Sequence, residues 1–117
     1  MKKLPKGGSE MYCRNEYSPT EEISEGVLMK PLAYGEKTLL TEITFEKGSK
    51  LPSHSHPHEQ TGYLVSGRVE LTIGEETYKI QPGDSWSIPG GMSHKAEVKE
   101  NSKAIEVFSP VREEYLL

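Results

Sequence analysis

The chain has 117 residues, a length that suits one domain with a modest hydrophobic core. Its formal net charge of -4 comes without a block of basic residues, which argues against a nucleic-acid-binding surface. The basic start MKKLPKGG leads into no apolar stretch, so we expect neither a secretory signal nor a membrane span. The single cysteine, Cys13, excludes an internal disulfide, and a cytoplasmic protein is therefore expected.

The N-terminal part is polar and mixed in character. We expect residues 1–25 to form an arm with little core of its own, able to exchange between two subunits. Alternation of apolar and polar residues begins over 27–32 and is clearest over 39–45. Both segments are predicted strands, and one face of the second carries Leu39, Thr41, Ile43 and Phe45.

The segment GSKLPSHSHPHEQTGYLVSG, residues 48–67, carries the strongest functional signal in the chain. In an extended strand, side chains two or four residues apart project from the same side, so His54, His56 and Gln60 are expected to converge. Imidazole nitrogens suit divalent transition metals, and a carboxamide oxygen can complete such a site. His94, which follows a Pro-Gly turn, is a fourth candidate ligand.

The rest of the chain contains short strand signals separated by turns. The predicted strands are residues 68–73, 77–80, 85–88, 94–98 and 103–108. The first two form a hairpin signal, and the polar residues 100–102 separate the last two. No amphipathic helix of crossover length lies between them, and the Gly and Pro content fits many turns. An all-β sandwich or barrel is therefore predicted.

Two motifs of the chain resemble those of the cupin family. The first runs Gly, His-x-His, Glu and Gly in that family, and the matching positions here are Gly48, His54, His56, Gln60 and Gly67. The second runs Gly, Pro-x-Gly, His and Asn, matched by Gly83, Pro89, Gly91, His94 and Val98. Gln60 and Val98 depart from the pattern. The resemblance implies a jelly-roll β-barrel (double-stranded β-helix) over residues 26–117, including a C-terminal strand and tail.

In such a barrel, His94 can face the other histidines across the interior. We expect one divalent transition metal ion (Zn, Ni, Fe, Mn or Co), held by His54, His56, Gln60 and His94. A neutral Gln60 would leave the ion its full double charge. The alternatives are a polar loop or a barrel without metal. His58 is either a residue behind the ligands or a surface residue, and Glu59 is expected to face solvent.

The C-terminal segment AIEVFSPVREEYL adds a second group of candidates. Glu106 and Phe108 share a strand face, and Arg112 can reach the barrel mouth to pair with an anion. HSHPHEQ together with this acid-x-Phe-x3-Arg ending resembles the KdgF family, small cupins that linearise unsaturated uronates, in which the acid is commonly Asp. The resemblance implies that Glu106 moves a proton, Arg112 holds a carboxylate and Phe108 flanks the sugar ring. The alternative is a structural salt bridge, a core aromatic and a solvated arginine.

The function implied is metal-dependent ring opening of delta-4,5-unsaturated uronates, such as unsaturated galacturonate, to 5-keto-4-deoxyuronate. A cupin dioxygenase, another metal-dependent isomerase and a non-catalytic sugar-binding or small-molecule-binding cupin remain alternatives. The expected partner is a small carboxylated sugar, with no nucleic acid and no membrane. Apolar residues on both faces of residues 103–108, including Ile105 and Val107, favour a homodimer, although an arm buried within one subunit explains them equally well.

Overall fold

The computed structural model describes residues 11–17 and 19–116, so residues 1–10 and 18 of the expected N-terminal arm lie outside the described residues. Strands dominate this part of the chain: β1 Glu21–Ser24, β2 Val27–Tyr34, β3 Leu39–Phe45, β4 Lys50–His54, β5 Glu59–Ile73, β6 Glu76–Ile80, β7 Ser85–Ile88 and β8 His94–Ser109. Two single-turn 3-10 helices, η1 Asn15–Tyr17 and η2 Glu113–Tyr115, flank them. Within the described ranges, no helix is long and apolar enough to cross a membrane.

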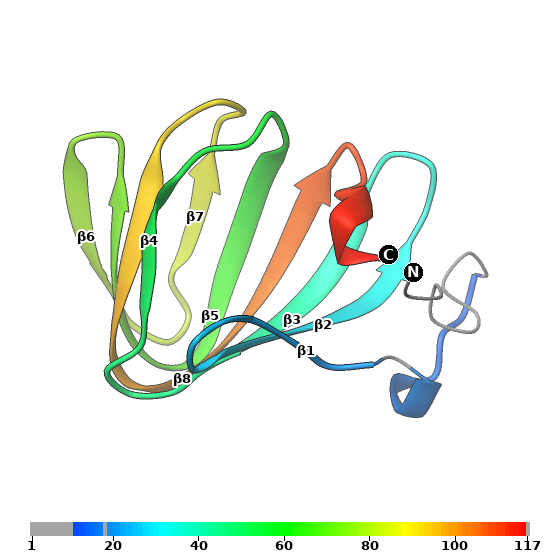
Figure 1. Ribbon diagram of the computed structural model, residues 1–117, viewed down its shortest axis with the longest axis horizontal. Coiled ribbons are helices and arrows are strands. Elements are labelled where there is room, and N and C mark those ends of the chain that lie inside the picture. Colours follow the sequence, from blue (N-terminus) through cyan, green and yellow to red (C-terminus); the bar gives the residue numbers. More distant parts are fainter. Residues whose placement is uncertain (1–10, 18, 117) are drawn as a thin grey trace.

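The strands form two antiparallel layers that share β5 and β8. The C-terminal half of β8 and the N-terminal half of β5 lie in a layer of order β1-β2-β3-β8-β5-β7. The other halves of the same two strands lie in a layer of order β4-β8-β5-β6. In Figure 1, β8 passes from beside β4 to beside β3 along the bottom of the molecule. This is the predicted all-β jelly roll.

The two shared strands are longer than the sequence pattern predicted. Residues 94–98 and 103–108 were predicted as separate strands, but β8 is continuous through the polar residues between them. Ser102 explains this continuity, because its Oγ accepts a hydrogen bond from the Arg68 backbone N–H (3.0 Å) and donates to the Glu100 carbonyl (2.7 Å). A bend in the sheet therefore occupies the position where a turn was expected.

β5 bends at the same level as β8. Gly67 has a φ of 97°, a left-handed conformation that an L side chain adopts only with strain, and the pairing of β5 with β8 shifts register on both sides of it. A Cβ built on Gly67 would lie 2.0 Å from Ser102 Oγ and 2.5 Å from Ser102 Cα. Gly67 and Ser102 together form the corner at which the two long strands change layers.

The hydrophobic core fills the space between the layers. The predicted alternation over residues 39–45 is confirmed, since every second side chain of β3 is buried. The main cluster draws on both layers and contains Val27, Met29, Ile43, Phe45, Leu64, Val69, Leu71, Ile80, Ala96, Val98 and Ala104. Ile23 of β1 packs against it, so this end of the expected arm joins the same core. A second cluster of Leu39, Phe108 and Leu116 holds the C-terminal tail.

Candidate metal centre and active site

Three histidines meet where β4, β5 and β8 approach one another. His54 ends β4 and lies opposite His94, the first residue of β8, with ring centroids 4.2 Å apart. His56 follows in the connection to β5, and its ring centroid is 5.0 Å from that of His94. The predicted convergence is confirmed, but the reason given was wrong: the chain turns between β4 and β5, and the segment is not one extended strand.

Each of these imidazoles is anchored through Nδ1 by a backbone carbonyl. The partners are Pro52 O for His54 (2.9 Å), His58 O for His56 (3.0 Å) and Met92 O for His94 (2.9 Å). A carbonyl only accepts, so each Nδ1 carries the hydrogen and each Nε2 keeps its lone pair when the ring is neutral. Anchoring of this kind is typical of metal-binding histidines.

The electrostatic environment favours the neutral form of two of the rings. Burial lowers the pKa of His56, and the nearby positive charge of Arg112 adds to the effect. Burial also lowers the pKa of His94, whose buried Nε2 has no hydrogen-bond partner in the structure. The ligand atoms of His54, His56 and His94 all lie within 4.8 Å of one another, so these three residues can hold a metal ion.

Gln60 is placed as an oxygen donor to the same centre. The Gln60 Nε2 donates a short hydrogen bond to Glu106 Oε2. This hydrogen bond turns Gln60 Oε1 toward His56, where it lies 3.0 Å from His56 Nε2. The lone pairs of His56 Nε2 and Gln60 Oε1 then face each other, because the ring hydrogen of a neutral His56 is on Nδ1. Adjacent ligands about 2.1 Å from one ion are separated by about 3 Å when their bonds meet at a right angle. The donor set of three imidazoles and one amide oxygen therefore fits a divalent transition metal.

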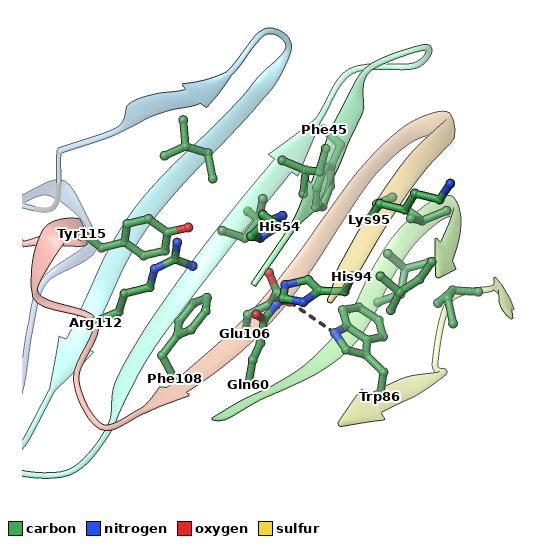
Figure 2. Close-up of a pocket in the computed structure, with 18 residues that line it drawn as sticks. Phe45, His54, Gln60, Trp86, His94, Lys95, Glu106, Phe108, Arg112 and Tyr115 are labelled. Atoms are coloured by element: carbon green, nitrogen blue, oxygen red, sulfur yellow. Dashed lines mark hydrogen bonds between the residues drawn. The ribbon is translucent and has the colours of Figure 1, made fainter. Parts of the chain in front are cut away.

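Glu106 lies behind Gln60 on β8 and is buried. Its Oε2 accepts from Gln60 and from the Trp86 indole N–H (3.2 Å), as Figure 2 shows for Trp86. Burial raises the pKa of Glu106, while the two donors and Arg112 act in the opposite direction. Both hydrogen bonds use Oε2, so Oε1 is the oxygen that can exchange a proton with a bound molecule.

Arg112 reaches the same pocket from the segment before η2. Its guanidinium lies over the rings of Phe108 (5.2 Å) and Tyr115 (4.2 Å), an arrangement that Figure 2 shows from the side. Burial, as the main cause, raises the pKa of Tyr115 to about 12, so that ring stays neutral. Arg112 Nε is 3.5 Å from an oxygen of the exposed Glu114 but forms no hydrogen bond. The stacked guanidinium is therefore held in place and turned toward the pocket.

The sequence-predicted residues therefore gather around one cavity. Most of them line it, namely His54, Gln60, His94, Glu106, Phe108 and Arg112, and His56 lies against it through Gln60 and Phe108. Phe108 is almost fully buried and touches His56 edge-on, at 5.9 Å between centroids. His58 is half-buried and its Nδ1 has no hydrogen-bond partner, whereas Glu59 is exposed as predicted.

Sequence reasoning missed Trp86 and Tyr115, which also line the cavity. Trp86 is the only tryptophan in the chain and lies on a predicted strand. The available signal was Gly62, because glycine inside a strand often marks a close approach by another group. Tyr115 lies in the tail after β8, where no periodic pattern predicted its direction.

Comparisons with known proteins agree with this fold and site. The family model described as Cupin domain matches residues 41–109. Pectin degradation protein KdgF of Dickeya dadantii is 27% identical over 107 residues, which cover 90% of this chain and 97% of that protein. The structure of KdgF from Halomonas sp. has 28% identity and a TM-score of 0.83, covering 90% of this chain and 99% of that one.

A second solved structure supports the same assignment. The RmlC-like cupin from Shewanella frigidimarina has 28% identity and a TM-score of 0.85, and the match covers 92% of this chain and 96% of that one. The predicted resemblance to the cupin family and, from HSHPHEQ and the C-terminal segment, to small KdgF-like cupins is thus confirmed. The chain belongs to the cupin family.

Proposed function

We propose that this protein opens the ring of delta-4,5-unsaturated uronates such as unsaturated galacturonate, giving 5-keto-4-deoxyuronate. One observation carries the proposal: a group of three histidines able to bind metal, a buried carboxylate and a stacked guanidinium face a single cavity. The similarity to pectin degradation protein KdgF supports the same substrate class.

The reaction is an isomerisation in which one proton leaves an oxygen and one proton arrives at a carbon. The hydroxyl on C1 of the cyclic substrate loses its proton, and the bond between C1 and the ring oxygen breaks. Its electrons pass to the ring oxygen, which leaves an aldehyde at C1 and an enolate at C5. Protonation at C4 converts that enolate into the 5-ketone, so no water is added or lost.

Glu106 is positioned to carry the proton. Its Oε2 is held by Gln60 and Trp86, and Oε1 is left to accept the hydroxyl proton and return a proton to C4. The raised pKa of Glu106 suits both steps, since a carboxyl group that binds a proton more tightly is a stronger base once ionised. The protonated carboxyl group of Glu106 would be buried, away from water that could compete for its proton.

Arg112 and Phe108 would position the substrate. The guanidinium can pair with the C6 carboxylate through two parallel hydrogen bonds, and its position over the rings of Phe108 and Tyr115 reduces the entropy lost on binding. Phe108 would limit the depth to which the sugar ring enters. The carboxylate end of the substrate would then lie beside Arg112 and its reacting end near Glu106.

His54, His56, His94 and Gln60 would hold one divalent ion such as Zn, Ni, Fe, Mn or Co. Such an ion would supply positive charge where negative charge builds on the ring oxygen and the neighbouring carboxylate. Because the amide of Gln60 is neutral, the ligand set would not reduce that charge.

The direct test is the loss of the conjugated double bond of freshly made unsaturated galacturonate, followed by absorbance. Metal-loaded protein should exceed the spontaneous rate, and chelated protein should return to that rate. If none of the five metal-loaded forms exceeds the spontaneous rate, ring opening by this protein is contradicted. Oxygen uptake by the iron-loaded form would instead favour a dioxygenase, and saturable uronate binding without turnover would favour a binding protein.

A further inference from the structure

Trp86 reaches Glu106 across an intervening strand. Gly62 on β5 is paired with Trp86 on β7 at one side and with Glu106 on β8 at the other. The three residues therefore form one row across three strands, on the face that is directed into the barrel. The indole crosses β5 at Gly62, and its N–H donates to Glu106 Oε2 at 3.2 Å.

Only glycine at position 62 permits this crossing. A Cβ built on Gly62 would lie 2.2 Å from Trp86 Cε2 and 2.4 Å from Nε1, closer than any real Cβ contact. Gly62 does not have a left-handed backbone conformation, so its backbone angles do not require a glycine. The space that the indole needs explains why glycine occupies this position. Gly62 thus leaves the space in which the Trp86 side chain crosses β5.

The hydrogen bond from Trp86 fixes the orientation of Glu106, and Glu106 fixes that of Gln60. An amide side chain can turn by 180° and exchange its oxygen with its nitrogen. A carboxylate oxygen accepts and does not donate when ionised, so it selects the arrangement in which Gln60 Nε2 faces Glu106. That arrangement directs the amide oxygen toward His56 and the metal position.

We propose that Trp86, laid across Gly62, is a positioning residue for the metal centre, acting through Glu106 to hold the amide oxygen of Gln60 as a ligand. The proposal rests on the metal-binding part of the proposed function and is independent of the uronate reaction. Residues that orient a metal ligand from behind typically change metal affinity about 10- to 100-fold when they are replaced.

The test is the dissociation constant of Zn²⁺ and of Ni²⁺ for the purified full chain, measured by competition with a chromophoric chelator and without substrate. Trp86→Phe keeps an aromatic ring and removes the N–H, and it should weaken binding about 10-fold. Gly62→Ala keeps the N–H but displaces the indole, and it should weaken binding similarly. Tyr78→Phe, an exposed position on the groove beside Trp86, is the matched control and should bind as the wild type does.

A double-mutant cycle separates positioning from a general loss of structure. If Trp86 acts through Glu106, adding Trp86→Phe to Glu106→Gln should weaken binding less than Trp86→Phe does in the wild type. Trp86 is the chain's only tryptophan, so its emission should change on metal addition, and this change should be smaller in Glu106→Gln. Denaturant unfolding identifies any variant that has lost its fold.

The outcomes distinguish this proposal from the proposed function. Wild-type affinity in both folded Trp86→Phe and folded Gly62→Ala would overturn the role of Trp86 and leave ring opening untouched. If the losses of metal-binding free energy in Trp86→Phe and Glu106→Gln are additive in the double variant, Trp86 does not act through Glu106. A wild-type chain that binds neither ion would overturn the metal centre itself. Weaker binding in both variants with normal metal binding in the wild type would support the proposal even if no uronate were converted.

Discussion

Gln60 changes where negative charge lies around the candidate metal centre. A glutamate at this position, as in the usual cupin motif, would bring its charge directly to the ion. In this chain the position is neutral, and the carboxylate of Glu106 lies one hydrogen bond further away. The sequence alone predicted both residues as members of the site, because the motif spacing and strand alternation identify them. Their hydrogen bond was not predictable, since it depends on the pairing of β5 with β8.

Replacement of Glu106 should affect the proton transfer. In Glu106→Gln the carboxyl group is lost, and we expect kcat to fall by about 100-fold or more, the usual effect of losing a general acid or base. Glu106→Asp should retain part of the activity, because the carboxyl group remains but is withdrawn by one methylene. Steady-state rates with metal-loaded variants provide the test, with Glu97→Gln on the outer side of β8 as control. An unchanged kcat in folded Glu106→Gln would exclude Glu106 as the proton carrier.

Arg112 should be sensitive even to a change that keeps its charge. Lysine has no planar group to stack over the rings of Phe108 and Tyr115 and cannot form two parallel hydrogen bonds to a carboxylate. Loss of charged hydrogen bonds worth about 1.5–3 kcal/mol should lower kcat/KM roughly 10- to 100-fold in Arg112→Lys. Arg68→Lys, at an exposed ion pair with Glu100, is the control and should match the wild type. Equal kcat/KM values for Arg112→Lys and wild type would show that no bidentate contact forms.

At the scale of elements, the site depends on the two bent strands. The N-terminal half of β5 carries Gln60, and β8 carries both His94 and Glu106, so the bend determines how these residues meet. The sequence predicted most strands and their inward faces from local alternation. It predicted a break over residues 100–102 because polar residues there resemble a turn. The actual bend is stabilised by contacts between β5 and β8, which no local pattern encodes.

A comparison of Gly67, at this bend, with Gly83, before β7, separates the free-energy cost of backbone strain from that of steric clash. Gly67 and Gly83 both have left-handed backbones, with φ of 97° and 94°, but only Gly67 has a neighbour within 4 Å of a built Cβ. Gly83→Ala should cost about 1–2 kcal/mol of unfolding free energy from strain. Gly67→Ala should cost about 1–3 kcal/mol more, because its Cβ meets Ser102. Denaturant unfolding measures both, and equal losses would contradict a close-packed corner.

At the scale of the whole molecule, the outer face of the β5–β8 layer carries apolar side chains. Tyr63 is 48% exposed and is paired across the strands with Ile105, while Val107 lies two residues further along β8. β8 therefore has Glu106 and Phe108 buried on its inner face, and the apolar Ile105 and Val107 half-exposed on its outer face. An exposed apolar group of this kind suits a protein partner.

We propose that this outer face forms a homodimer. A symmetric contact would bring the same residues together twice, so one charged substitution would place two like charges in the interface. Val107→Lys should therefore convert the dimer to a monomer, whereas Thr44→Lys, placed further along the same layer, should not. Light scattering coupled to a sizing column provides the measurement. A wild-type chain that is monomeric at all concentrations would contradict the proposal.

The proposed opening of an unsaturated uronate ring requires the metal centre, Glu106 and Arg112 together. Its most direct test is a proton NMR time course of freshly made unsaturated galacturonate, with metal-loaded protein, chelated protein and no protein compared in parallel. We predict that the cyclic anomeric signals disappear fastest with metal-loaded protein, as signals of the linear 5-keto-4-deoxyuronate appear. Identical time courses in all three samples would contradict metal-dependent ring opening by this protein.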